Sequence, residues 1–332
     1  MFIWFQRNLC LLIITGFFIS CGKTTTPPIP HFPIGSEYPN ICVTDIGFIM
    51  IWYEGDRHLV MSEFTGENWI PKDTVVSSER FFKNWADLPQ IFHIGGDTIA
   101  LSWLEMSGEG TYDYNVKVSM SVDRGKTWSD PVIPHRDGTK GEHGFVSFFK
   151  YLGKTGIIWL DSRAIMANDY NLSPKGMRLY MSTINSSGNL GPEIMLDDMV
   201  CECCPTSAVN TIEGPLIAYR DRSIDEVRNI QLSLINDTRL KYPVSEDGWI
   251  IPGCPVNGPK MAVNGDKVAI VWYTAPNYES KVNMAFSKDG GLSFGTPIKI
   301  DNGYAIGRVC LLYTSDAADE GLGVDLGGRR II

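Results

Sequence analysis

The eight residues SVDRGKTW at Ser121–Trp128 have a second copy of the same pattern, SKDGGLSF, at Ser287–Phe294. Both copies read S-x-D-x-G-x-[ST]-[WF], and each follows a segment of alternating apolar and polar residues, 116–120 and 282–286. An Asp carboxylate can accept hydrogen bonds from turn amides, and a Gly adopts the positive φ that a tight turn needs. The pattern therefore predicts two β-hairpins of the same construction.

This repeated pattern resembles the Asp-box of the sialidase (BNR-repeat) superfamily of β-propellers. In that family the box is structural and lies away from the active site. The resemblance implies a propeller architecture and leaves the reaction open. The structural Asp-box residues would be Ser121, Asp123, Gly125, Trp128, Ser287, Asp289, Gly291 and Phe294.

A large aromatic residue ends an apolar segment five times along the chain, at intervals of about 50 to 60 residues. These residues are Trp52, Trp103, Trp159, Tyr219 and Trp272. A polar loop and another alternating segment follow each of them, which gives about four strands per repeat and no helical pattern. We therefore expect an all-β, six-bladed, sialidase-like β-propeller over residues 37–309. Its last blade would begin near Gly307-Arg308-Val309 and be largely missing.

The N-terminal segment has the features of a bacterial lipoprotein signal peptide over residues 1–21. A cation, Arg7, precedes an apolar run, and Phe18-Ile19-Ser20-Cys21 resembles a lipobox in which Cys21 becomes lipidated. A transmembrane anchor is the alternative, but the apolar run is short for one. Residues 22–36 then form a Pro/Thr-rich tether. Because Gly22 follows the cysteine, we expect an outer-membrane lipoprotein that faces the periplasm or the cell exterior and contacts the membrane through its lipid alone.

The C-terminal segment, residues 310–332, resembles a translated sequencing adapter. Cys310 to Glu320 matches a transposon-type adapter read in frame, and Gly323 to Ile332 matches its continuation. A genuine polar tail is the alternative. We expect the native sequence to stop near Val309, which would truncate the propeller.

The charge composition limits the kinds of molecule that the protein is expected to bind. The formal net charge is −9 and no basic run is present, which argues against a nucleic-acid partner. The resemblance implies a glycan or glycoconjugate as partner, and we expect a monomer.

Propeller ligands bind at one mouth of the central channel, where the first strand of each blade starts and the second strand ends. Counting back from the aromatic residues places the strand starts near Asp87, Glu142-His143, Cys203-Cys204 and Asn257. The second strands end near Asp161 and Asp221, and Arg163 and Arg222 follow them. This topology predicts one pocket lined by both sets.

Resemblance to sialidases implies three arginines that clamp a substrate carboxylate, an Asp as acid/base, and a Tyr nucleophile paired with a Glu. Guanidinium groups suit this clamp because they bind a carboxylate bidentately. The catalytic candidates are Asp87 as acid/base, with Glu142, His143 and Asp161; the substrate-binding candidates are Arg163, Arg222, Arg308, Asp221 and Asn257. No Arg-Ile-Pro motif precedes the first full blade, and no Tyr can be assigned as nucleophile. Each arginine could instead form a salt bridge with a neighbouring acid.

Four cysteines form a second cluster of interest: Cys201, Cys203, Cys204 and Cys254. Four thiols could hold a soft metal ion. Export favours disulfides, and one such bond would link Cys254 to one cysteine of the 201–204 cluster. We expect no cofactor apart from a metal at this cluster.

Three functions follow from these patterns. The first is an exo-sialidase-like glycoside hydrolase that acts on a terminal acidic sugar. The second is a non-catalytic propeller that binds a glycan or a protein, with structural cysteines. The third is a metal-dependent enzyme that uses the thiol cluster.

Overall fold

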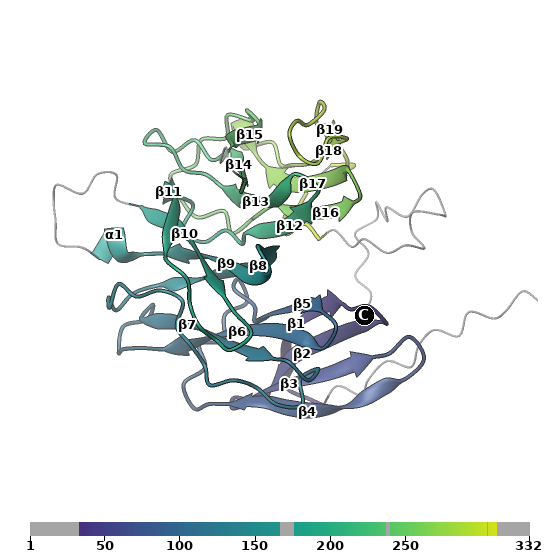
Figure 1. The fold of residues 1–332 in the computed structure, drawn as a ribbon. Helices are drawn as coiled ribbons and strands as arrows, with labels where there is room; N and C mark the ends of the chain where they lie inside the picture. The colour runs from purple at the N-terminus through teal and green to yellow at the C-terminus, as the bar shows by residue number, and fades with distance from the viewer. Residues whose placement is uncertain (1–32, 167–175, 237–239, 304, 311–332) are drawn as a thin grey trace, which may run out of the picture.

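The computed structural model describes residues 33–166, 176–236, 240–303 and 305–310. These residues form five antiparallel sheets in chain order (Figure 1). The strands of the first two sheets are β1 (Ser36–Val43), β2 (Phe48–Glu54), β3 (His58–Phe64), β4 (Trp69–Ser77), β5 (Gln90–Gly95), β6 (Thr98–Met106) and β7 (Tyr114–Ser121). The third sheet contains β8 (His143–Tyr151), β9 (Lys154–Asp161), β10 (Met177–Ile184) and β11 (Ile194–Val200).

The last two sheets contain β12 (Ser207–Thr211), β13 (Gly214–Arg220), β14 (Ile230–Leu234), β15 (Lys241–Ser245), β16 (Lys260–Asn264), β17 (Lys267–Thr274), β18 (Lys281–Ser287) and β19 (Ile298–Lys299). A single turn of helix, α1 (Arg163–Met166), and a 3₁₀ turn, η1 (Pro276–Tyr278), complete the described elements. The second sheet has three strands, and Val132 bridges Val118 of β7 where a fourth strand would pair.

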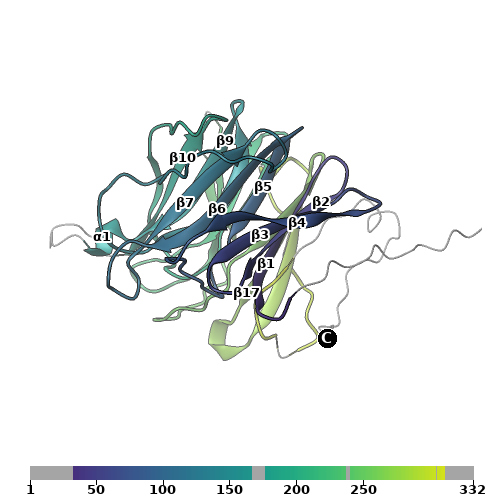
Figure 2. The same cartoon turned by 90° about the horizontal axis from the view of Figure 1, so that it is seen from below.

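The strands of each sheet pair in chain order, so every sheet is a meander. Their first strands touch in succession: β1 contacts β5, β5 contacts β8, β8 contacts β12, and β12 contacts β16. First strands that neighbour one another in this way form the inner ring of a propeller. Figure 2 shows the same sheets from below. The described residues form five sheets, and 305–310 contain no strand, so the sixth blade stays a prediction.

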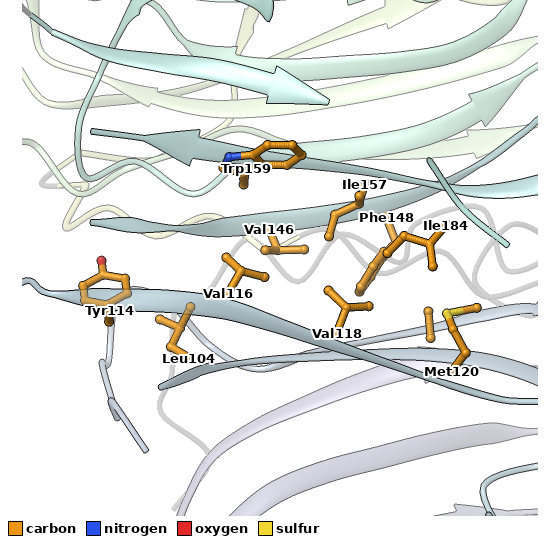
Figure 3. Packing of buried hydrophobic residues seen from close by; sticks show 11 residues of the cluster. Leu104, Tyr114, Val116, Val118, Met120, Val146, Phe148, Ile157, Trp159 and Ile184 are labelled. Atoms are coloured by element: carbon orange, nitrogen blue, oxygen red, sulfur yellow. The ribbon is translucent and has the colours of Figure 1, made fainter. Parts of the chain in front are cut away.

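The five repeated aromatic residues lie on the second strand of each sheet and are at most 1% exposed. Four of them, Trp103, Trp159, Tyr219 and Trp272, belong to hydrophobic clusters that pack neighbouring sheets together. Figure 3 shows one such layer, in which Trp159 and Ile157 of β9 and Val146 of β8 face Val116 of β7 and Leu104 of β6. Each fully buried side chain of this kind stabilises the fold by about 2–3 kcal/mol. The pattern of recurring aromatics thus reports the inter-sheet cores.

Both hairpins expected from the repeat are present, with matching hydrogen bonds. In the first, Ser121 Oγ donates to Asp123 Oδ1 at 2.9 Å and accepts from the Gly125 amide at 2.7 Å. Gly125 and Gly291 have φ of +82° and +91°, which favours glycine. The second hairpin repeats these contacts at 2.7 and 2.8 Å through Ser287, Asp289 and Gly291.

Several sequence-based expectations concern residues that the structure does not describe. The signal peptide with Cys21, most of the tether and residues 311–332 lie outside the described residues. Within the described ranges, no helix has the length and apolar character needed to cross a bilayer.

Candidate functional site

Asp87 lies in the loop between the first and second sheets, just before β5. Asp87 is 5% exposed, and its Oδ2 accepts a hydrogen bond of 2.6 Å from the Phe145 amide on β8. Gly144 leaves the room for this contact, since a Cβ there would lie 2.1 Å from Asp87 Oδ2. Burial raises the pKa of Asp87 to about 7, the Phe145 amide opposes the rise, and the negative charge of Glu142 adds to it. The carboxyl therefore keeps its proton into the neutral range, as a general acid requires.

Glu142 is the second carboxylate beside Asp87. The Tyr114 hydroxyl donates to Glu142 Oε1 at 2.7 Å, and the edge of the Tyr114 ring lies 3.3 Å from the same Cβ position of Gly144. Burial raises the pKa of Glu142, while the Tyr114 hydrogen bond lowers it. Burial and the neighbouring carboxylates raise the pKa of Tyr114 far above its usual range, so its hydroxyl remains a donor. Sequence reasoning missed Tyr114 because this contact crosses from one sheet to the next.

Arg308 and Trp85 form an exposed corner of the same loop region. The Arg308 guanidinium lies over the Trp85 ring at 3.9 Å and donates to the Trp85 carbonyl at 2.7 Å. Asn257 holds the Arg308 backbone by accepting from its amide. Among the described residues, no carboxylate forms a salt bridge with Arg308. Its charge is thus available to an anionic ligand.

Arg163 is neutralised by two acids. It makes two bonds to Asp161, of 2.8 and 2.6 Å, and one of 2.9 Å to Glu193. Asp161 is itself buried and accepts from the Trp159 indole at 2.8 Å. The acid two residues after the repeated aromatic therefore fixes that aromatic, as Glu105 does for Trp103 at 2.9 Å. This pattern gives Asp161 a structural role.

Arg222 pairs with Glu202 and Glu226 and not with its neighbour Asp221. Buried Arg228 joins the same two glutamates, at 3.3 and 2.7 Å, so two cations balance two anions. Asp221 is separate from this network. Burial raises the pKa of Asp221 to about 6, and the charge of Asp197 adds to the rise.

The cysteine cluster joins the fourth and fifth sheets. Cys203 and Cys254 form a disulfide, with their Cα atoms 6.0 Å apart. Cys201 and Cys204 are not joined by a disulfide bond in this structure and are 1% exposed, with their sulfurs 2.7 Å apart. Burial opposes ionisation of Cys201, but the Cys204 thiol and the positive charge of Arg228 lower its pKa to about 7.

His143 is fully buried at the start of β8. Its Nε2 lies 3.3 Å from Asp137 Oδ1 and 3.8 Å from Asp161 Oδ1. His135 stacks on it in parallel, with ring centroids 3.6 Å apart. Sequence reasoning singled out His143 alone, because His135 and Asp137 lie in a loop without a recurring pattern.

The candidates thus fall into separate groups. Asp87 and Tyr114 approach each other at Gly144, Tyr114 binds Glu142, and Arg308 contacts both Asn257 and Trp85. His143, Asp161 and Arg163 form a third group, while Arg222 lies in the glutamate network next to the cysteines. The predicted three-arginine clamp stays a prediction, and two of its members already hold carboxylates.

No family model matches this chain, and no curated protein matches it. Solved structures do. An α-L-arabinanase from Penicillium chrysogenum is 14% identical, with 81% of this chain and 82% of that chain covered and a TM-score of 0.50. An α-L-arabinofuranosidase from Fusarium graminearum is 14% identical, with 82% of each chain covered and a TM-score of 0.49. A Hadza microbial sialidase is 14% identical, with 81% of this chain and 59% of that chain covered and a TM-score of 0.43.

The likeness to the arabinanase concerns the fold. This chain has the all-β propeller fold that occurs in glycoside hydrolases.

Proposed function

We propose that this chain is a glycoside hydrolase that removes a terminal acidic sugar from a glycan, in the manner of an exo-sialidase. The observation that carries the proposal is that Asp87 and Tyr114 both approach Gly144, with Tyr114 bonded to Glu142 at 2.7 Å and the charge of Glu142 acting on Asp87. Most glycosidases use such a pair, one carboxyl group protonated and the other ionised.

The two carboxyl groups take different roles because their surroundings differ. Asp87 is buried and retains its proton, so it protonates the glycosidic oxygen as the bond breaks. Glu142 is held by the Tyr114 hydroxyl, which favours its ionised form. As an anion it stabilises the positive charge that develops on the sugar or activates the attacking water.

Preference for an acidic sugar rests on Arg308. A guanidinium without a carboxylate partner binds a substrate carboxylate through a charge-assisted hydrogen bond. Trp85, which is 57% exposed, offers an aromatic face beside it. In this proposal Arg163 and Arg222 stabilise the loops around the site and do not bind substrate. Asp161 and Glu193 balance the charge of Arg163, and Glu202 and Glu226 balance that of Arg222.

The test is hydrolysis of a panel of methylumbelliferyl glycosides: an α-sialoside, a glucuronide and an α-arabinofuranoside. We expect turnover of an acidic glycoside, with a loss of about 100- to 10,000-fold in kcat/KM for Asp87→Asn. Asp123→Asn, in the first Asp-box, is the control and should leave kcat unchanged. Lack of turnover on every substrate contradicts the enzyme, and turnover of the arabinofuranoside alone contradicts the acidic sugar.

A glycan-binding propeller without catalysis is the second candidate. The observation that favours it is the low exposure of Asp87, 5%, together with the balanced charges of Arg163 and Arg222. It predicts retention of acidic glycans on an array by a protein that hydrolyses none of them. A metal enzyme built on the cysteines is less favoured, because the disulfide uses two of the four sulfurs.

We also propose that the chain is a monomeric outer-membrane lipoprotein anchored at Cys21. Metabolic labelling with a fatty acid analogue, compared between the natural sequence and Cys21→Ser, tests the anchor. Label retained by Cys21→Ser contradicts it.

A further inference from the structure

Four cysteine sulfurs lie together where the loop after β11 meets the loop before β16. Cys203 and Cys254 form the disulfide, and Cys201 and Cys204 carry free thiols. Cys201 Sγ lies 2.7 Å from Cys204 Sγ and 4.0 Å from Cys203 Sγ. A pair of thiols is therefore in contact with a disulfide, and the glycosidase proposal uses neither.

The backbone fixes the turn that carries three of these cysteines. At the start of the turn, the Cys201 amide donates to the Arg220 carbonyl at 3.0 Å, which ties the turn to β13. At its end, Pro205 approaches Gly258 so closely that a Cβ added to the glycine would lie 1.7 Å from the Pro205 carbonyl oxygen. The sulfurs are thus held near one another by backbone that is fixed on both sides.

The distance between the two free sulfurs distinguishes a covalent partner from a shared metal ion. Zn–S bonds of about 2.3 Å place two thiolate ligands of a tetrahedral ion roughly 3.8 Å apart. A disulfide bond is about 2.05 Å long. The separation of 2.7 Å between Cys201 and Cys204 is too short for two ligands of one ion and close to that of a bond. Their C-x-x-C spacing is one in which redox-active cysteine pairs occur.

Cys201 has the properties of an attacking thiolate. Burial alone would raise the pKa of its thiol, but the hydrogen bond from Cys204 and the positive charges of Arg228 and Arg220 lower it to about 7. Both guanidinium groups belong to buried residues, so water screens their charges little. The thiolate is the nucleophile in thiol–disulfide exchange. Cys201 therefore supplies this nucleophile at neutral pH, 4.0 Å from a sulfur of the disulfide.

We propose that Cys201 and Cys204 reduce the Cys203–Cys254 disulfide within the folded chain by thiol–disulfide exchange. In the first step, the Cys201 thiolate attacks Cys203 Sγ and forms a mixed disulfide. The bond to Cys254 breaks, and its electron pair leaves on Cys254 Sγ, which takes a proton from water. In the second step, Cys204 attacks Cys201 Sγ, and the proton of Cys204 passes to the departing Cys203 Sγ. Two electrons move from one cysteine pair to the other, so no external oxidant or reductant is needed.

The burial of the four cysteines gives the exchange a direction in space. Cys201 and Cys204 are 1% exposed, Cys203 is half-buried, and Cys254 is exposed. Water stabilises the thiolate that leaves on Cys254, and a more stable thiolate is the better leaving group. The exchange thus transfers reducing electrons from a buried pair to a thiol at the surface. There the thiol meets external disulfides, which are the class of substrate that it would reduce.

A static cluster is the competing interpretation. In it, the Cys203–Cys254 disulfide joins the fourth and fifth sheets permanently, and the two buried thiols do not react. The two interpretations differ at Cys254. A cysteine in a permanent disulfide cannot be alkylated without a reductant, whereas exchange presents its thiol to the solvent.

The test is alkylation of the full chain with N-ethylmaleimide at neutral pH without reductant, followed by an acid quench and peptide mapping by mass spectrometry. Mapping of an acid-denatured portion first confirms that the sample holds one disulfide among the four cysteines. We expect N-ethylmaleimide to accumulate on Cys254 with time. Cys201→Ser should prevent this labelling, because it removes the attacking thiolate. Cys204→Ser keeps that thiolate, so Cys254 should still be labelled and a Cys201–Cys203 disulfide should be found.

Cys42→Ser is the matched control, because Cys42 is a free cysteine outside the cluster and its loss should leave the labelling rate of Cys254 unchanged. A natural chain in which Cys254 stays unlabelled overturns the proposal in favour of the static cluster. Equal labelling of Cys254 in the natural chain and in Cys201→Ser overturns it as well, since Cys201 is then not the attacking group. Loss of labelling in both serine variants contradicts the order of the two steps.

Discussion

The hydroxyl of Tyr114 lies 2.7 Å from a carboxylate oxygen of Glu142, and this bond joins the second sheet to the loop before the third. It is the contact that lowers the pKa of Glu142 against the effect of burial. Asp87, whose pKa burial raises, lies across Gly144 from the Tyr114 ring. The Tyr114 hydrogen bond thus favours the ionised form of Glu142, while burial favours the protonated form of Asp87.

Tyr114→Phe removes this hydrogen bond and little else. We expect the pKa of Glu142 to rise, so the acidic limb of the kcat/KM profile should move to higher pH. The basic limb, which reports Asp87, should stay near its original position. The measurement is the pH–rate profile of both proteins on the acidic glycoside. An unchanged acidic limb would assign that limb to a group other than Glu142.

Asp87 makes stability depend on pH. Its pKa of about 7 in the folded chain lies above the value of about 3.9 expected in the unfolded chain. Between these pH values the folded state keeps a proton that the unfolded state has released. Stability therefore falls as pH rises from about 4 to 7, by roughly 1.4 kcal/mol per pH unit at most.

Asp87→Asn cannot ionise and should lack this loss. Urea unfolding of both proteins at pH 5 and pH 7.5 is the measurement. We expect the variant to gain in stability relative to the natural chain as pH rises. A constant difference between the two proteins across this range would show that Asp87 titrates normally.

Arg308 is predicted to bind the carboxylate of an acidic substrate and to make no contribution to the binding of a neutral substrate. Arg308→Ala should raise KM for the acidic glycoside by about 10- to 100-fold, the worth of a charge-assisted hydrogen bond, with a smaller effect on kcat. A neutral glycoside of the same leaving group serves as control. Equal rises in KM for both substrates would mean that the variant disturbs the Trp85 loop and does not remove a carboxylate ligand.

Gly258 is required by a close approach of two loops. An added Cβ would lie 1.7 Å from the Pro205 carbonyl oxygen, a backbone atom that cannot move aside alone. Gly258→Ala should cost about 3 kcal/mol of unfolding free energy. Gly265→Ala is the control, because its φ is +60° and nothing lies within 4 Å of the added Cβ, so it bears the backbone cost of about 1 kcal/mol. A cost for Gly258→Ala no larger than the control would contradict the close contact.

The sequence predicted those parts of the fold that recur locally. The Asp-box of Ser121–Trp128 carries its own hydrogen bonds within eight residues, and the buried Trp159 ends a recognisable strand. Contacts between blades follow no such rule. Tyr114 meets Glu142 across 28 positions with no pattern linking them, and His135 becomes relevant only when the loop folds onto His143.

The spacing of residues along the sequence also could not distinguish residues of a functional site from residues that stabilise the fold. Asp161 was predicted as a site residue from its place after Trp159, and that same place lets it accept the indole hydrogen. Arg163 and Arg222 were chosen as carboxylate ligands, and they hold carboxylates of the chain itself. A side chain's partners in three dimensions decide such cases, and the sequence order does not contain them.

The sequence analysis selected Arg222, and not Arg220, as a substrate-binding residue. In the structure, Arg220 is the arginine that joins the fourth sheet to the fifth sheet and the loop before it. It is 1% exposed and donates to three backbone carbonyls, those of Asn257, Arg228 and Tyr273, at 2.8, 2.7 and 2.6 Å. Arg220→Met keeps most of the side-chain volume and removes all the donors. Each buried carbonyl left without a donor costs about 1–3 kcal/mol, so the loss should be at least about 3 kcal/mol.

Urea unfolding measures this loss, with Arg57→Met as control because the Arg57 side chain is 66% exposed and pairs with an exposed Glu79. The control should change stability by less than about 1 kcal/mol. Arg220 donates to the Asn257 carbonyl, and the Asn257 side chain in turn accepts from the Arg308 amide. Arg220→Met should therefore also displace Asn257 and Arg308, and KM of the folded protein for the acidic glycoside should rise. A stable Arg220→Met protein with an unchanged KM would show that this junction neither depends on Arg220 nor positions Arg308.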